Sequence, residues 1–100
     1  MMIFNTTYVV DEKIHAAWMQ WMRNYYIKEI EETTPLSEPA LFKVLSQEVE
    51  GESYCLQFSA PSILEMKEWE NKHKERLEEM MREKFGESVL FFSTYLKQLL

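Results

Sequence analysis

The feature that most constrains the fold is a change of hydrophobic period that occurs twice along the chain. Apolar residues alternate with polar ones, as in a half-buried strand, and then recur every three or four residues, as in an amphipathic helix. The order is strand, helix, strand, strand, helix, strand, at residues 2–11, 12–32, 40–48, 53–60, 62–86 and 88–100. This order predicts an α+β, ferredoxin-like βαββαβ sandwich, with a four-stranded antiparallel sheet and two helices on one face.

Helix and turn signals mark the ends of these segments. Asp11 is a good N-cap for the first helix, and Ser62 with Glu65 forms a capping box for the second. Gly51 supplies the turn between the second and third strands, and Gly86 is placed as a helix C-cap. These local start and stop signals therefore agree with the segment bounds that the hydrophobic periodicity predicts.

Each predicted helix carries an apolar stripe that we expect to face the sheet. The stripe of the first helix contains Ile14, Ala17, Trp18, Trp21, Met22 and Tyr25, and it is widened on one flank by Met19, Tyr26 and Ile30. The stripe of the second contains Met66, Trp69, His73, Leu77 and Met80, with Lys and Glu in opposed pairs on the solvated remainder. Packing these stripes on a sheet predicts a hydrophobic layer, and a hydrophobic pocket can form within it.

Length and charge exclude several classes of protein. The 100 residues predict a single domain, residues 1–100, and the net charge of −6 disfavours binding to nucleic acid or to an anionic membrane. A single cysteine, Cys55, and an N-terminus without a basic, apolar leader predict a cytoplasmic protein. Two glycines cannot make a phosphate-binding loop, so no cofactor is expected.

Four residues are candidates for binding a ligand: Asn5, His15, Trp18 and His73. His15 lies on the flank of the first stripe near Trp18, where it either lines a cleft or is only half-exposed. His73 lies in the second stripe, either as a hydrogen-bonded core histidine facing the sheet or as a base in a pocket. Asn5 and Trp18 supply a polar and an aromatic group to such a pocket, and no catalytic residue can be named.

Two Glu-x-x-His spacings, Glu12 to His15 and Glu70 to His73, resemble half of a di-iron carboxylate site. The other half requires two glutamates from two more helices, which this order of elements does not have. The chain is rich in glutamate, so we expect no metal site. Cys55 lies in the middle of a strand, where a small hydrophobic role is the expected one.

The opening strand has two half-apolar faces, because Ile3 and Val9 alternate with Phe4, Tyr8 and Val10. The last strand also has apolar residues on both faces, so the sheet face away from the helices would expose a contiguous apolar patch. A second copy of the chain is the commonest way to cover such a face. We therefore expect a homodimer packed through the open sheet face.

Five segments together resemble domain-of-unknown-function family 4286, a family of short bacterial proteins: IFNTTYVVD, WMQWM, EPALFKVLS, GESYCLQF and FGESVLFFST. The resemblance implies a ferredoxin-like fold similar to dimeric α+β barrels and brings no activity or site residues. One hypothesis is a homodimeric binding or regulatory module that holds a small apolar or aromatic ligand between helices and sheet. The alternative is a small cofactor-independent enzyme, similar to antibiotic-biosynthesis monooxygenases, that acts on an aromatic substrate.

Overall fold

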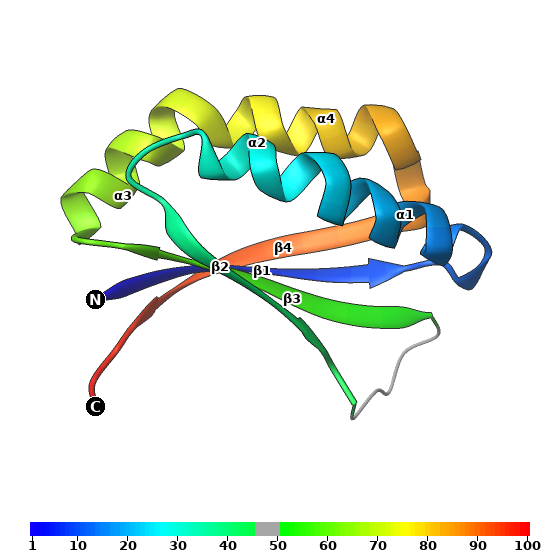
Figure 1. Ribbon diagram of the computed structural model, residues 1–100, viewed down its shortest axis with the longest axis horizontal. Coiled ribbons are helices and arrows are strands. Elements are labelled where there is room, and N and C mark those ends of the chain that lie inside the picture. The colour runs from blue at the N-terminus through cyan, green and yellow to red at the C-terminus, as the bar shows by residue number, and fades with distance from the viewer. Residues whose placement is uncertain (46–50) are drawn as a thin grey trace.

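The computed structural model describes residues 1–45 and 51–100, and it places every described helix on one face of a single sheet (Figure 1). The strands are β1 (Met2–Val10), β2 (Ser37–Lys43), β3 (Glu52–Ala60) and β4 (Val89–Lys97). The helices are α1 (His15–Trp21), α2 (Ile27–Glu31), α3 (Ile63–Trp69) and α4 (Glu75–Phe85). The chain forms one helical layer over one sheet layer, in the order that the sequence predicts.

The sheet is antiparallel throughout, with the strand order β2-β3-β1-β4. β1 pairs with β3 and with β4 along its whole length, so the first and third strands are central. This arrangement confirms the ferredoxin-like βαββαβ sandwich. The helices cover one sheet face, which leaves the other face, here called the open face, without a covering element among the described residues (Figure 1).

The local signals at the segment ends act as predicted. The Asp11 side chain accepts a hydrogen bond from the backbone N–H of Lys13, and the Ser62 hydroxyl accepts one from the backbone N–H of Glu65. Gly51 has a φ of 97°, and a Cβ there would lie 2.7 Å from the Val10 carbonyl oxygen, so only glycine fits. The rest of that predicted turn lies outside the described residues.

The second strand differs from its predicted bounds. It begins at Ser37 rather than at Ala40, and a bulge shifts its register between these two residues. Glu38 lies in the bulge with a φ of 54°, a conformation that the alternating pattern does not signal. The structure describes β2 only to Lys43, and the predicted extension through residue 48 enters the part of the chain that it does not describe.

A π-helical turn, Met22–Tyr26, joins α1 to α2 and changes which residues face the sheet. The buried residues of this helical region are Trp18, Met22, Tyr26 and Ile30, spaced by four. An α-helix has about 3.6 residues per turn, so a spacing of four drifts around its axis, and the wider π turn offsets this drift. The predicted stripe is therefore wrong at Tyr25, which is 44% exposed, and at Ala17.

A second π turn, Glu70–Lys74, joins α3 to α4 and has the same effect. Met66, Trp69, Leu77 and Met81 are buried, whereas the predicted stripe assigned Met80 and His73 to the inner face. His73 is partly buried, with its ring beside that of the buried Trp69, and is less enclosed than the core residues around it. The extra residue in the π turn rotates the following helix, so that residues expected on the solvated face lie against the edge of the sheet.

The core is formed by the inner side chains of both layers. Its largest fully buried members are Trp18, Phe58, Met22, Leu56, Met66 and Leu77. Among the described residues, no helix is both long enough and apolar enough to cross a membrane.

Candidate functional site

The strongest candidate site is a cleft between the helices and the β1–β4 side of the sheet, here called the helix–sheet cleft. Its apolar wall consists of Phe4, Tyr8, Leu56, Phe58, Trp69 and Phe91. Its polar groups are Thr6, Ser93, Lys74 and Glu78. The enclosed space is about 20 Å³, room for one water molecule, and the cleft counted out to solvent contains about 360 Å³.

Two hydroxyl groups lie on the floor of this cleft. Thr6 of β1 and Ser93 of β4 are register partners, and their hydroxyls are hydrogen-bonded at 3.0 Å. Thr6 is 5% exposed and lies between Phe4 and Tyr8 on the helix-facing side of β1. These two residues, here called the hydroxyl pair, interrupt an otherwise apolar surface. Buried hydroxyl groups need hydrogen-bond partners, and here the two hydroxyls satisfy each other inside an apolar surface.

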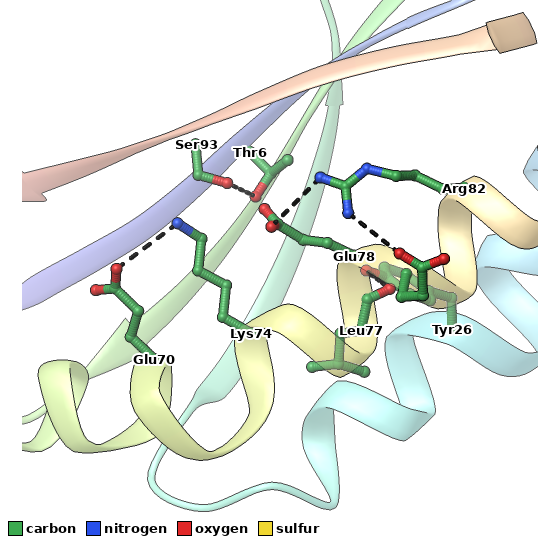
Figure 2. Close-up of polar contacts among 9 residues, drawn as sticks. Thr6, Tyr26, Glu70, Lys74, Leu77, Glu78, Arg82 and Ser93 are labelled. Atoms are coloured by element: carbon green, nitrogen blue, oxygen red, sulfur yellow. Dashed lines mark hydrogen bonds and ion pairs between the residues drawn. The ribbon is translucent and has the colours of Figure 1, made fainter. Parts of the chain in front are cut away.

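The opposite wall of the cleft includes Lys74 and Glu78. They are the middle two of four charged residues spaced by four, Glu70, Lys74, Glu78 and Arg82, here called the charged row. Figure 2 shows these side chains along the side of the helix that faces β1 and β4. The row is joined by ion pairs, with Lys74 Nζ 3.7 Å from Glu70 and Arg82 Nη2 3.8 Å from Glu78. The spacing and the π turn together bring this row over β4.

The two cations of the charged row lie over aromatic rings of β4. The Lys74 ammonium is 5.9 Å from the ring centre of Tyr95, and the Arg82 guanidinium is 5.3 Å from that of Phe91. Such contacts are weak when exposed to water, about 0.5–1 kcal/mol each. Between the two cations, the Glu78 carboxylate is directed toward the hydroxyl pair (Figure 2). The cleft is therefore closed toward solvent by side chains that can move at little energetic cost.

Two buried tyrosines complete the polar lining. Tyr26 donates a hydrogen bond from its hydroxyl to the Leu77 carbonyl oxygen at 3.0 Å, which ties the first helical segment to α4. Burial raises the pKa of Tyr8 well above its ordinary value, and Tyr26 and Glu78 nearby raise that pKa further. Burial is also the main cause of the raised pKa of Tyr26, followed by the Glu78 carboxylate. Both phenols are therefore neutral donors at physiological pH.

These raised pKa values predict a loss of stability in alkali. An unfolded tyrosine releases its proton near pH ~10, whereas folded Tyr8 and Tyr26 hold theirs to higher pH. The unfolded state then binds fewer protons, so the free energy of unfolding is retained below about pH 10 and falls as the pH rises above it. Urea unfolding measured from neutral to alkaline pH should show this fall, and Tyr8→Phe should reduce its slope. Tyr25→Phe, at an exposed position, is the control and should leave the slope unchanged.

Asn5, one of the four residues proposed from sequence, lies outside this cleft. Its side chain is on the open face, where its amide donates to the Thr94 hydroxyl at 3.1 Å and its carbonyl oxygen accepts from Gln57 at 3.3 Å. Thr7 and Cys55 contact each other on the same face, with oxygen and sulfur 3.6 Å apart. Asn5 thus belongs to a polar band across the middle of the open face.

His15 and Trp18 come together around Tyr54, at the end of the sheet away from the hydroxyl pair. His15 Nε2 is hydrogen-bonded to the Tyr54 hydroxyl, and the two rings are stacked 5.5 Å apart. Burial, with a smaller effect of Glu52, raises the pKa of Tyr54, so that hydroxyl can donate to His15. Trp18 is fully buried between Tyr54 and Tyr8. Neither His15 nor Trp18 lines the cleft.

His73 lies within the second π turn and is partly buried, with its ring 6.4 Å from that of Trp69. It does not line the cleft, so the structure separates His73 and Asn5 from the pair formed by His15 and Trp18. Within residues 1–45 and 51–100, no three His, Cys, Asp or Glu side chains are grouped to hold a metal ion.

Sequence reasoning missed the residues that line the cleft. The Lys and Glu residues of the second helix were interpreted as opposed pairs on a solvated face, and neither Thr6 nor Ser93 was named as a candidate. Lys74 and Glu78 belong to a series of charges, Glu70, Lys74, Glu78 and Arg82, that alternate in sign at a strict spacing of four, a pattern that a solvated helix face also shows. That spacing places one charged row along a helix that has a π turn.

Comparison with solved structures supports the fold. An ethyl tert-butyl ether degradation (ethd) family protein from Bacillus halodurans C-125 is similar with a TM-score of 0.74 and 8% identity, over 99% of this chain and 100% of that one. A candidate antibiotic biosynthesis monooxygenase from Deinococcus radiodurans has a TM-score of 0.70 and 11% identity, over 100% and 94%. HapK from Hahella chejuensis has a TM-score of 0.70 and 10% identity, over 99% and 93%.

At these identities the likeness concerns the fold alone. No curated protein matches the chain in sequence. A family model does match, and it covers residues 1–99. The chain therefore belongs to the domain of unknown function family DUF4286.

Proposed function

We propose that the protein is a homodimeric binding module that holds a small apolar or aromatic ligand in the helix–sheet cleft. The observation that carries this proposal is the meeting of the hydroxyl pair and Glu78 inside an aromatic-lined cleft. Ligand sites combine apolar walls with a few convergent polar groups, and this cleft has that composition.

The volume of the cleft sets a condition on binding. The closed space of about 20 Å³ is far below the roughly 300 Å³ or more of a typical ligand pocket. The side chains over its mouth, Lys74 and Arg82, are long and are held by weak contacts to Tyr95 and Phe91. Moving them outward would open the cleft without disturbing the backbone of either layer.

The alternative is an enzyme of the same architecture acting on an aromatic substrate. Glu78 would be its base, since it is directed toward the hydroxyl pair (Figure 2). A general base is normally oriented by a second group, and the two histidines lie away from this cleft. We therefore favour binding, and turnover of a bound compound would favour the enzyme.

The proposed dimer uses the open face. Its exposed apolar residues include Phe42, Leu90, Phe92 and Leu96, which are 52%, 63%, 60% and 42% exposed. The open-face residues of β1, β3 and β4 include no charged side chain, although 28% of the whole chain is charged. A two-fold axis brings a surface against its own copy, where like charges would repel each other, so the uncharged centre of this face suits this symmetry. The Glu38 carboxylate of the edge strand β2 reaches only the side of the face, where it accepts a hydrogen bond from Ser59 at 3.4 Å. The polar band around Asn5 would lie at the middle of the interface.

The binding proposal predicts a response to suitable compounds. A panel of neutral, charged, aliphatic and aromatic metabolites should contain a compound that raises the melting temperature, because a ligand of the native state stabilises it. Ser93→Leu, which places a larger side chain on the floor of the cleft, should abolish that shift. Ala17→Leu, at an exposed helical position, should retain it. An undiminished shift in Ser93→Leu would contradict the assignment of the site.

A further inference from the structure

We infer that the ligand of the helix–sheet cleft is a neutral, flat molecule with a hydroxyl group that donates a hydrogen bond to Glu78. This inference rests on the proposed function and adds the chemical class of the ligand. It is drawn from the shape of the walls, the free hydrogen-bonding capacity of the floor, and the balance of charge at the mouth.

The walls favour a flat body. Phe4 and Trp69 contact each other with ring centres 4.9 Å apart, and Phe91 lies beside Tyr8 at 6.0 Å. Rings from both layers therefore line the space above the sheet. A planar ligand can place its faces against such rings in offset or edge-to-face contact, which a branched aliphatic body cannot do as well.

The floor favours a hydrogen-bond donor. Among the described residues, no hydrogen bond to the Glu78 carboxylate is formed, and its ion-pair partner Arg82 lies 3.8 Å away. The bond between Thr6 and Ser93 uses one hydroxyl hydrogen. The other can turn toward a ligand or toward Tyr8, whose pKa is raised mainly by burial and is lowered in part by a hydrogen bond from Thr6. The cleft thus presents a carboxylate that accepts and a hydroxyl that can donate or accept. A ligand hydroxyl can satisfy both, since it donates to the first and accepts from the second.

The mouth favours a neutral ligand. The charged residues that line the cleft are Lys74 and Glu78, whose charges sum to zero, and Arg82 next to them is paired with both Glu78 and Glu79. A cationic ligand at Glu78 would be repelled by Lys74 and Arg82 on either side, and an anionic ligand would be repelled by Glu78 itself. Repulsion between like charges therefore disfavours both cationic and anionic ligands at this site. A neutral hydroxyl avoids both penalties.

A series of naphthalenes substituted at the same ring position tests this inference, using the wild-type protein and isothermal titration calorimetry at neutral pH. Naphthol is the neutral donor, methoxynaphthalene lacks the donated hydrogen, naphthoate is an anion and naphthylmethylammonium is a cation. We expect naphthol to bind about tenfold more tightly than methoxynaphthalene, the ratio typical of one hydrogen bond to a charged acceptor. Both charged compounds should bind more weakly than naphthol.

Two glutamate variants test whether Glu78 causes the preference for naphthol. Glu78→Gln should reduce the preference for naphthol over methoxynaphthalene severalfold, while Glu83→Gln, an exposed position on the same helix, should keep it. Circular dichroism and the melting temperature establish that both variants are folded. If methoxynaphthalene or a charged compound binds as tightly as naphthol, the inference is wrong and the proposed binding function stands. If no compound of the series binds but the metabolite panel still raises the melting temperature, the inference is wrong and the binding function stands. If neither the series nor the panel binds, both are wrong.

Discussion

Phe92→Glu is expected to leave the protein monomeric at micromolar concentration, where the wild type should scatter light as a particle of about twice 12.1 kDa. Phe92 is 60% exposed near the middle of β4, and it points away from the helices. In a two-fold dimer the substitution introduces two carboxylates into one interface. The penalty for removing each from water is on the order of several kcal/mol, enough to dissociate a dimer of ordinary affinity.

The matched control is Leu64→Glu, which makes the same change of charge at an apolar residue that is 66% exposed on α3. Because α3 lies on the helical side of the sheet, this variant should remain a dimer. Both variants should keep the melting behaviour of a folded chain at high dilution. A monomeric wild type, or an unchanged dimer in Phe92→Glu, would show that the open face is not the interface.

Trp18→Ala should cause the largest loss of stability of any single change in the core, about 3–5 kcal/mol. Trp18 is fully buried, with its ring centre 5.4 Å from that of Tyr8 and 5.2 Å from that of Tyr54. The loss would be a large part of the roughly 5–15 kcal/mol available to a domain of this kind. Urea unfolding followed by circular dichroism measures it directly.

Two tryptophan-to-phenylalanine variants provide the control. The Trp18 indole N–H is buried and has no hydrogen-bond partner among the described residues, whereas the Trp69 N–H donates to the Thr33 hydroxyl at 2.7 Å. Trp18→Phe removes an unsatisfied donor, which offsets part of the lost packing, and Trp69→Phe breaks a bond. Trp69→Phe should therefore destabilise more than Trp18→Phe. Equal losses would contradict this account of the two indoles.

The fold could be predicted from sequence because local and long-range signals agree. Alternation along β3, the helical periods of the two helical segments, the caps at Asp11 and Ser62, and the turn at Gly51 all favour the same order of elements. The bounds of β2 were less accurate, since a residue with positive φ, Glu38, starts a bulge that alternation does not signal. Hydrophobic periodicity indicates which face of a strand or helix is buried, but it does not reveal bulges or π turns.

The site could not be predicted, and the reason is the π turn of Glu70–Lys74. Ideal helical spacing assigned His73 to the inner face and Glu78 to solvent, and the turn rotates both by the width of one residue. A charged pair with a spacing of four has the same sequence signature whether it faces water or a sheet. His15, a candidate chosen for its residue type, lies against Tyr54 and does not line the cleft. The polar side chains that do line the cleft include Thr, Ser and Glu, which are common residue types with no distinctive signature.

The same turn has a consequence for how relatives should be aligned. A π turn contains one more residue than the α-helical turn that would span the same rise. A relative with an uninterrupted helix would therefore lack one residue between positions 70 and 74. An alignment without a gap there would match each residue of α4 with the neighbour of its true counterpart, and Glu78 would appear variable. Placing the gap inside the turn restores the correspondence and allows the conservation of Glu78 across the family to be judged.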